Sequence, residues 1–218
     1  AMIALQSLSK TNKVMEEIQN RITTGLRVNG PKDDAATFAI AQNMRGDIAG
    51  MNALKTTLGL GQSTVNVAID AGKAISNLLT EMKAKSVQAS QAGLDSDSYS
   101  ALQNDFNSLR AQLMTIAETA EFNGKNLIIA RATDLQVLST IQGSTVTVAA
   151  QSLDPTTLLV HTATLATANS DSQAIVIINS AITSVVNSLD SLRFMAKCVD
   201  IQASFTSKLI NIMKQGVG

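Results

Sequence analysis

The sequence is poor in aromatic residues, and this limits what its interior can be. Aromatic residues make up 3 % of the 218 residues, with no Trp and one Tyr, whereas hydrophobic residues reach 45 %. A core must therefore be built from Leu, Ile, Val, Met and Ala. These residues pack well along narrow helix seams and do not form a deep aromatic-lined pocket.

Cysteine and histidine each occur once, which excludes several kinds of site. A single Cys cannot form an intrachain disulfide, and one Cys with one His is too few for a zinc site. A Ser-His-Asp triad needs a histidine oriented by an acid, but His161 lies in an apolar, β-like run, where we expect a structural role. We expect Cys198 to be a small residue at or beside a helix seam. No cofactor or metal is expected, and the sequence indicates that the protein is not an enzyme.

Net charge and long apolar runs are lacking as well. Lys+Arg and Asp+Glu number 17 each, so we predict no surface for nucleic acid or an anionic membrane. No window approaches eighteen uninterrupted apolar residues, so no transmembrane helix is expected. Residues 1–13 lack the basic start and apolar stretch of a signal peptide. If the protein works outside the cell, we expect it to leave by a route other than a cleaved signal.

The sequence is rich in apolar residues at heptad spacing. Near the C-terminus, apolar residues follow one another at alternating steps of four and three over more than five repeats, which predicts one long helix with a coiled-coil seam. This seam comprises Ile178, Ile182, Val185, Leu189, Leu192, Ala196, Val199, Ala203, Thr206, Ile210, Met213 and Val217. Phe205, Leu209 and Ile212 widen it, so we expect this end to face more than one partner helix. A shorter N-terminal seam comprises Ala4, Leu8, Thr11, Met15, Ile18 and Ile22, and we expect its helix to end at Gly25.

Two more helices are predicted between these seams. The turn-rich residues 26–31 form a connector, after which Asp33 or Asp34 caps a new helix; this capping role is favoured over a metal or acid pair. Apolar residues then recur near the 3.6-residue period from Ile40 to Met82. We expect a bend at residues 59–61 and close contacts at the glycines of this helix. Residues 93–98 cap a third helix, which runs from Tyr99 to Ala120.

The middle of the chain has a different pattern. Residues 145–148 alternate with period two and are β-branched, which predicts a strand preceded by a turn. We expect partner strands at residues 135–141 and 157–162, within a small β excursion over residues 127–168. Residues 170–172 would then cap the last helix.

The predicted fold class is mainly α: an elongated bundle of long antiparallel helices with a small β-hairpin excursion, in which the terminal helices form a coiled coil. The remaining helices would bundle beside the two terminal segments that carry the seams. Seams at both ends of a chain suit self-association, because copies can share seams side by side.

Two blocks of sequence resemble a known family. Residues 21–36 read RITTGLRVNGPKDDAA, and residues 116–127 read IAETAEFNGKNL. Both closely resemble segments of bacterial flagellins. The resemblance covers residues 1–128 well and 175–218 more weakly. Relative to the family, the chain looks trimmed at both termini and short in its central region, and residues 192–198 depart from the usual pattern.

The resemblance implies a structural subunit that polymerises into the extracellular bacterial flagellar filament for motility. It also implies that residues 1–33 and 195–218 form an inner terminal coiled-coil region with its connector, and that residues 34–194 form an outer helical bundle, which includes the short β excursion at 127–168. It implies self-assembly with other flagellin subunits, type III export without a cleaved signal peptide, and an export chaperone and a cap protein as partners. Two alternatives stay open: a hook–filament junction protein of the same superfamily, and a surface adhesin or glycan-binding flagellin-like protein. Arg27 would lie between two assembly layers and pair with acids of a neighbour, although a solvated role is also open. The residues expected to carry assembly are Leu8, Met15, Ile18, Ile22, Arg27, Asp33, Asp34, Ala203, Ile210 and Met213.

Overall fold

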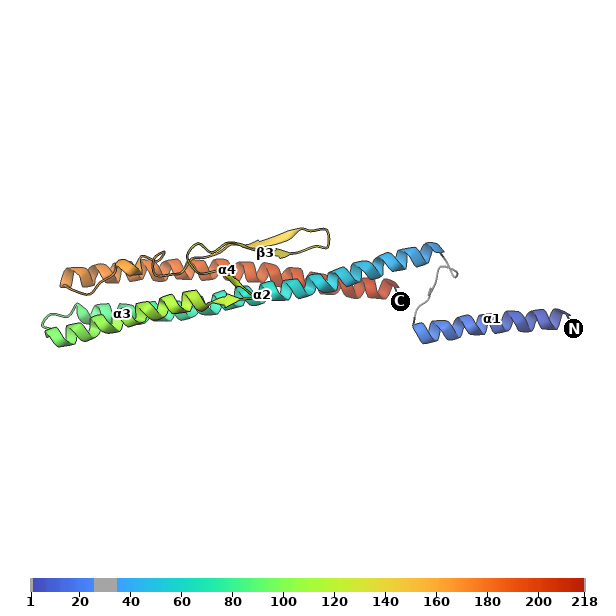
Figure 1. The fold of residues 1–218 in the computed structure, drawn as a ribbon, viewed down its shortest axis with the longest axis horizontal. Coiled ribbons are helices and arrows are strands. Elements are labelled where there is room, and N and C mark those ends of the chain that lie inside the picture. Colours follow the sequence, from blue (N-terminus) through green and yellow to red (C-terminus); the bar gives the residue numbers. More distant parts are fainter. Residues whose placement is uncertain (1, 26–34, 218) are drawn as a thin grey trace. The chain divides into compact units, whose positions relative to one another are not determined.

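The computed structural model describes residues 2–25 and 35–217. Within them lie the helices α1 (Met2–Thr24), α2 (Ala35–Ala89), α3 (Ser96–Thr119) and α4 (Ala168–Val217) (Figure 1). Two short antiparallel strand pairs and a 3₁₀ turn connect α3 to α4. The predicted fold class, mainly α with long antiparallel helices and a small β excursion, is confirmed. Arg27 and the proposed caps Asp33 and Asp34 lie outside the described residues.

The chain divides into two compact units. One contains Ala1–Thr56, Thr140–Gln142 and Ser204–Gly218, and the other contains Thr57–Ser139 and Gly143–Ala203. The division that we predicted between an inner terminal region and an outer bundle stays a prediction.

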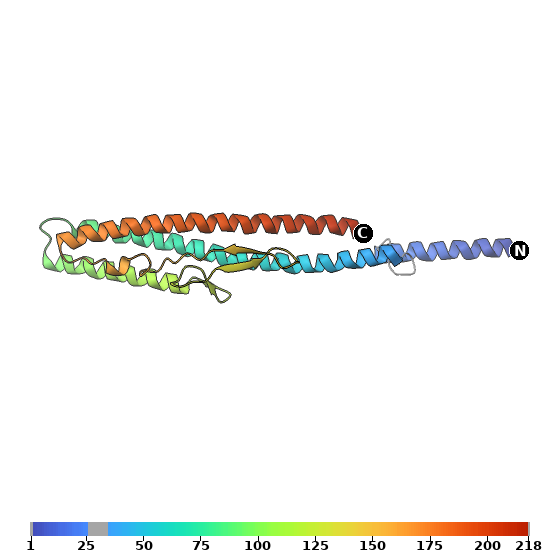
Figure 2. The ribbon, with the colours of Figure 1, turned by 90° about the horizontal axis from the view of Figure 1, so that it is seen from above.

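The second unit is built around three helices that lie side by side. Its part of α2 runs antiparallel to α3 and to α4 in both views (Figures 1 and 2). Apolar side chains from these helices and from the segment after α3 fill the space between them. The fully buried large residues of this unit are Leu58, Ile75, Leu79, Met82, Phe106, Leu113, Leu127, Ile128, Leu153, Leu165, Ile178 and Leu192. Close packing of such residues is the main stabilising contribution to a helix bundle.

The C-terminal heptad seam is the inward face of α4. Of its twelve residues eight are buried, the other four are half-buried, and none is exposed. Thr206 is buried within the seam despite its hydroxyl. The prediction of one long helix with a coiled-coil seam is therefore confirmed.

The structure also confirms two of the predicted helix ends. Gly25 adopts a φ of 66° and its N–H donates to the carbonyl of Arg21 (2.8 Å), which ends α1 as expected. Asp95 accepts from the N–H groups of Asp97 (3.1 Å) and Ser98 (2.8 Å) at the start of α3. These hydrogen bonds, led by the one from Ser98, lower the pKa of the Asp95 carboxyl.

The predicted cap of α4 at residues 170–172 is correct only for Ser170, because the helix begins earlier, at Ala168. Ser170 Oγ accepts from the N–H of Thr167 (2.8 Å), and the N–H of Ser170 donates to Thr167 Oγ1 (3.3 Å). This reciprocal pair is a capping box, formed here by two hydroxyl residues rather than by a hydroxyl and Glu or Gln. Asp171, in contrast, is buried.

The hairpin predicted in the middle of the chain is present, although the third strand is not. Strand β3 (Leu135–Leu138) pairs antiparallel with β4 (Thr145–Val148), as expected. The prediction of a strand at residues 157–162 is wrong. Asp154 accepts hydrogen bonds from the N–H groups of Thr156 (3.0 Å) and Thr157 (3.1 Å), and these bonds form a turn directly after Asp154. The 3₁₀ turn η1 (Val160–Thr162) follows. Local hydrogen bonding by Asp side chains competes with strand formation in this way.

A second, unpredicted hairpin joins β1 (Glu121–Phe122) to β2 (Lys125–Asn126). Its two turn residues, Asn123 and Gly124, both have positive φ, 51° and 76°. An Asn-Gly pair with these dihedral angles is typical of a type I′ hairpin turn. The Asn-Gly signal was visible in the sequence.

Helix α2 continues through the glycines at which we predicted a bend. The prediction that glycines mark close contacts is confirmed at two of them. A Cβ at Gly61 would lie 2.6 Å from Val137 Cγ2 in β3, and a Cβ at Gly72 would lie 2.8 Å from Leu189 Cδ2 in α4. Both glycines therefore make room for a neighbouring element.

By length and apolar composition alone, one described helix could cross a membrane. It is the stretch Ser170–Val217 of α4. Our expectation of no spanning helix rested on uninterrupted apolar runs and did not consider average hydropathy. Helices that bury a seam inside a bundle pass the same test, and α4 buries such a seam.

Candidate assembly surfaces

Helix α1 presents its apolar seam to solvent along its whole length. None of its residues is buried, and Leu8, Met15, Ile18 and Ile22 are between 50 % and 77 % exposed. The polar residues include an ion pair between Arg21 and Glu17 one turn apart. The helix is therefore amphipathic, and within the described residues its apolar side is uncovered.

An exposed helix of this kind needs a partner. A 23-residue helix is marginal in water, because most helix stability in proteins comes from packing an apolar face. Burying one Leu, Ile or Met fully contributes about 1.5–3 kcal/mol. Four such residues on a heptad seam give α1 a substantial driving force to pack against another helix.

The predicted assembly residues of α4 are placed differently. Ile210 is only 4 % exposed, and Ala203 and Met213 are half-buried. In the first unit, a Cβ at Gly216 would lie 3.1 Å from Met44 Cε of α2, so this end of α4 packs against α2 of its own chain. These residues hold α4 in place, and any role in subunit contacts stays a prediction, as it does for Arg27, Asp33 and Asp34.

The outward side of α4 carries exposed apolar residues, of which only some were predicted. Phe194, Ile201, Phe205 and Ile212 are between 57 % and 65 % exposed. Phe205 and Ile212 were expected to face a second partner, whereas Phe194 and Ile201 were missed. Their signal was present as a second set of heptad steps, offset by two residues from the buried seam.

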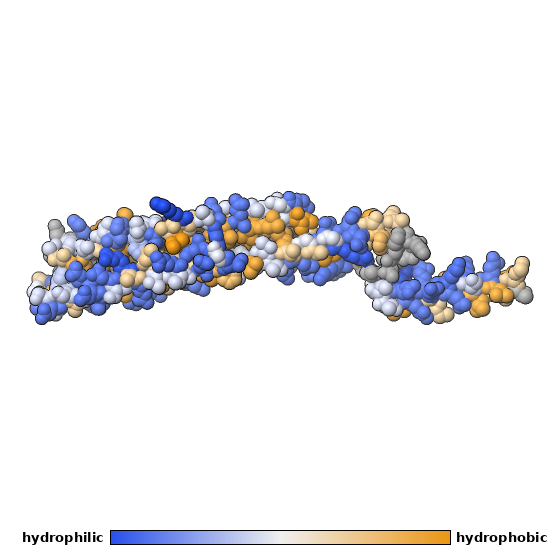
Figure 3. Space-filling view, viewed as in Figure 1, coloured by the Kyte–Doolittle hydropathy of each residue, from blue (hydrophilic) through white to orange (hydrophobic). Residues whose placement is uncertain are grey.

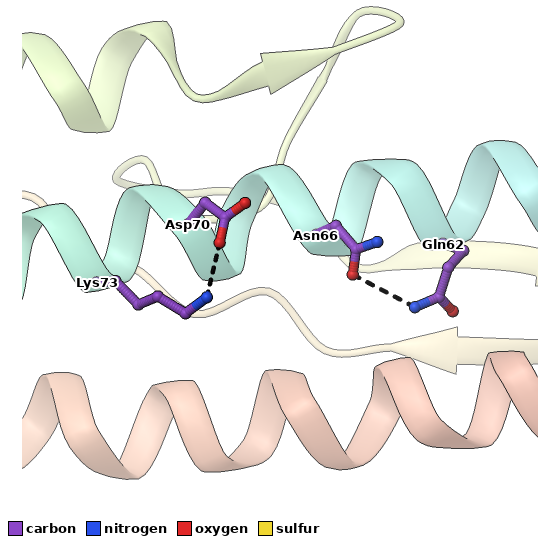
Figure 4. Close-up of polar contacts among 4 residues, drawn as sticks. All are labelled: Gln62, Asn66, Asp70 and Lys73. Carbon is purple, nitrogen blue, oxygen red and sulfur yellow. Dashed lines mark hydrogen bonds and ion pairs between the residues drawn. The ribbon is translucent and has the colours of Figure 1, made fainter.

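The exposed side of α2 has a different character in the second unit. Gln62 Nε2 donates to Asn66 Oδ1 (3.3 Å), and Lys73 pairs with Asp70 (2.8 Å) along one row of the helix (Figure 4). Such pairs at three- and four-residue spacing are typical of a solvated helix face and contribute only tenths of a kcal/mol. This row offers no apolar surface for a partner.

Cys198 and His161 are the two residues that were considered for chemistry. Cys198 is free and half-buried on α4. His161 lies in η1 rather than in a β-like run; its ring Nδ1 is 3.3 Å from the carbonyl oxygen of Pro155, and its own carbonyl accepts from Arg110 (3.2 Å). Among the described residues, no group of three or more His, Cys, Asp or Glu could hold a metal ion.

The only tyrosine of the chain is hydrogen-bonded to a buried acid in the second unit. The Tyr99 hydroxyl, on α3, donates to Asp171 Oδ1 on α4. Burial, together with the hydrogen bond to Asp171 and its charge, raises the pKa of Tyr99 from 10.0 to about 12.

This raised pKa predicts how stability changes at alkaline pH. Because the folded state favours the neutral phenol, the contribution of Tyr99 is fully present below pH 10 and is lost as pH rises toward 12. Ultraviolet titration of the single tyrosine is expected to show a midpoint near 12 in the folded protein and near 10 in denaturant. Asp171→Asn should lower the folded midpoint. A folded midpoint near 10 would contradict the assignment.

Comparison of the sequence with known protein families identifies the family of this chain. Residues 1–133 match the model of the bacterial flagellin N-terminal helical region. The chain belongs to the flagellin family. Flagellins polymerise with one another into the extracellular flagellar filament, and this flagellin is a structural subunit of such a filament.

Individual relatives agree with this assignment over the whole chain. The flagellin is 38 % identical to flagellin FljM of Caulobacter vibrioides, covering all of this chain and 80 % of the relative. It is 31 % identical to a flagellin of Brucella melitensis, covering all of this chain and 81 % of the relative.

Solved structures share the fold. Bacillus cereus flagellin aligns with a TM-score of 0.62 at 21 % identity, covering 69 % of this chain and 88 % of that one. A Vibrio parahaemolyticus chain assigned as a flagellar hook-associated protein aligns with a TM-score of 0.73 at 12 % identity, covering 87 % and 99 %. At such low identity these matches show the fold alone.

Proposed function

We propose that this flagellin joins its filament through the apolar seam of α1. The observation that carries the proposal is that α1 has heptad-spaced Leu8, Met15, Ile18 and Ile22 exposed and no residue buried. A coiled coil between terminal helices would cover such a seam. In this arrangement residues 1–33 and 195–218 form the inner region of the subunit and residues 34–194 the outer bundle, with Arg27, Asp33 and Asp34 at the connector.

The remaining α4 residues support assembly indirectly. Ile210 is buried, and Ala203 and Met213 are half-buried, so their side chains hold α4 as a fixed platform. The subunit has no catalytic role in this proposal. It is exported without a cleaved signal peptide, binds an export chaperone before assembly, and is added to the filament beneath a cap protein. Membership of the flagellin family supports these partners and this route.

A charge placed on the α1 seam tests the proposal. Ile18→Asp puts a carboxylate where a partner helix would pack, whereas Asn20→Asp puts the same group two residues away, on the opposite side of α1. Loss of one buried Ile costs about 1.5–3 kcal/mol, and about 1.4 kcal/mol corresponds to a factor of ten in affinity. The concentration needed for assembly should therefore rise at least about tenfold for Ile18→Asp. Asn20→Asp should assemble like the unmodified protein.

Sedimentation of polymer and electron microscopy of the products of the complete gene measure this difference. Circular dichroism provides the control that both variants remain equally helical as monomers. Equal assembly of the two variants would show that the α1 seam is not a subunit contact.

A further inference from the structure

We propose that Asn123 is a site of spontaneous chemical modification, namely deamidation, and that the folded β1–β2 hairpin controls how fast this modification occurs. Asn123 is followed by Gly124, and these two residues form the turn of the hairpin. Another Asn-Gly pair, at residues 29–30, lies outside the described residues. The proposal goes beyond the filament function and holds whether or not α1 carries the subunit contact.

Besides the two residues, the reaction needs only water. The main-chain nitrogen of Gly124 attacks Cγ of Asn123, and the new bond between nitrogen and carbon closes a cyclic imide. The bond from Cγ to the side-chain nitrogen breaks, and that nitrogen leaves as ammonia with the proton of the Gly124 N–H. Water then opens the ring at either carbonyl carbon and gives aspartate or isoaspartate. In isoaspartate the main chain passes through the side-chain carbonyl carbon and is longer by one methylene group.

The turn leaves both reacting groups accessible. Asn123 and Gly124 are exposed, and a Cβ at Gly124 would meet no atom within 4 Å. Among the described residues, no hydrogen bond holds the Gly124 N–H or the Asn123 side chain. On the face shown in Figure 3, the larger hydrophobic area lies over α4 and the β3–β4 hairpin rather than where α3 ends and this turn follows. Neither burial nor hydrogen bonding therefore protects the pair from the reaction.

The conformation of the turn, however, opposes ring closure. Asn123 and Gly124 have φ values of 51° and 76°, as in a type I′ turn. In such a turn the first residue has a ψ of about +30°, which directs the nitrogen of the next residue away from the side chain. Ring closure requires that nitrogen on the same side of the main chain as Cγ of Asn123. The hairpin must therefore open before the reaction starts, and the fraction of time that it is open sets the rate.

The residues next to the turn keep the hairpin closed. Asn126 in β2 donates from Nδ2 to the carbonyl oxygens of Ala117 (2.7 Å) and Glu118 (3.3 Å) at the end of α3. Its Oδ1 accepts from the N–H groups of Ile128 (2.8 Å) and Ile129 (3.0 Å). These bonds use both donors and both lone pairs of the amide, so Asn126 anchors β2 to α3. Isoaspartate in the turn would lengthen the main chain where a two-residue turn fixes the register, and this would strain the anchor.

Peptide mapping by mass spectrometry tests the proposal on the full chain. The protein is incubated at neutral pH, both folded and in guanidinium chloride, and each Asn is scored for conversion to aspartate and isoaspartate. In denaturant, Asn123 should convert faster than any other Asn of residues 2–25 and 35–217, because it alone among them precedes a Gly. Folding should slow its conversion at least about tenfold. Equal rates in the two states, or faster conversion at another Asn of these residues, would overturn the proposal.

Two Asn substitutions show whether opening of the hairpin limits the rate. Asn126→Ala removes the anchor and leaves Asn123 and Gly124 in place, so it should raise the rate in the folded protein at least about threefold and leave the rate in denaturant unchanged. Asn104→Ala makes the same chemical change at an exposed position of α3 and should alter neither rate. Circular dichroism checks that both variants are folded. Equal rates for the two folded variants would show that the hairpin does not control the reaction.

Gly124→Ala tests the chemistry itself and needs no folded protein. In denaturant, the added Cβ crowds the attacking nitrogen, so conversion of Asn123 should slow at least about fivefold. An unchanged rate would exclude the Gly124 nitrogen as the attacking group and would overturn the proposal.

Discussion

Phe106→Ala is expected to destabilise the second unit by about 3–5 kcal/mol, the usual cost of removing a buried aromatic ring from a core. Phe106 has no exposed surface and lies on α3 among the buried residues of the three-helix core. Its loss removes apolar burial and leaves a cavity that neighbouring side chains fill only in part. Chemical denaturation followed by circular dichroism measures the change in the free energy of unfolding.

Phe205→Ala is the control for this prediction. The chemical change is identical, but Phe205 is 58 % exposed, so its removal should change monomer stability by no more than about 0.5 kcal/mol. The better helix propensity of Ala offsets part of any lost contact. Similar destabilisation by both substitutions would contradict the placement of Phe106 in the core and Phe205 at the surface.

Gly61→Ala should destabilise the same unit although Ala is the better helix former. The new Cβ would lie 2.6 Å from Cγ2 and 2.9 Å from Cγ1 of Val137, closer than atoms of this kind approach. Val137 is buried on β3, and its β-branched side chain has little freedom at χ1, so the hairpin must shift. Overpacking of this kind costs about 1–3 kcal/mol, which outweighs a propensity gain of about 1 kcal/mol.

Gly59→Ala separates propensity from packing two residues away on α2. Nothing lies within 4 Å of a Cβ at Gly59, so the substitution should stabilise the protein by up to about 1 kcal/mol. The two variants should thus shift the thermal midpoint in opposite directions. A shift in the same direction for both would show that β3 does not rest on Gly61.

Long-range periodicity carried most of the fold prediction. The twelve-residue seam of α4 faces inward as expected, because a helix with an apolar stripe has one stable way to bury it. Structural features that depend on local polar groups were predicted less well. Asp154 turns the chain where β-branched residues suggested a strand, and Thr167 caps the last helix together with Ser170, before the predicted position. A few local hydrogen bonds determine the structure at both positions, and amino-acid composition does not predict such bonds.

The assembly surfaces show a similar division. The α1 seam was predicted from its spacing, and its residues are exposed as a partner surface requires. Spacing alone did not indicate that Ile210 is buried within its own chain, because a heptad seam reads the same whether its partner is internal or a second copy. The exposed apolar residues on the outward side of α4 were predicted only in part, because the buried seam on the same helix is the stronger pattern.

Electron microscopy of a bacterium whose own flagellin genes are deleted, and which expresses the complete gene of this protein, tests the central claim most directly. Long helical filaments are expected on such cells, and they should be lost when Ile18→Asp is introduced but not when Asn20→Asp is. Cells that export the protein and yet carry no filaments, or only a short structure at the hook, would contradict its assignment as the filament subunit.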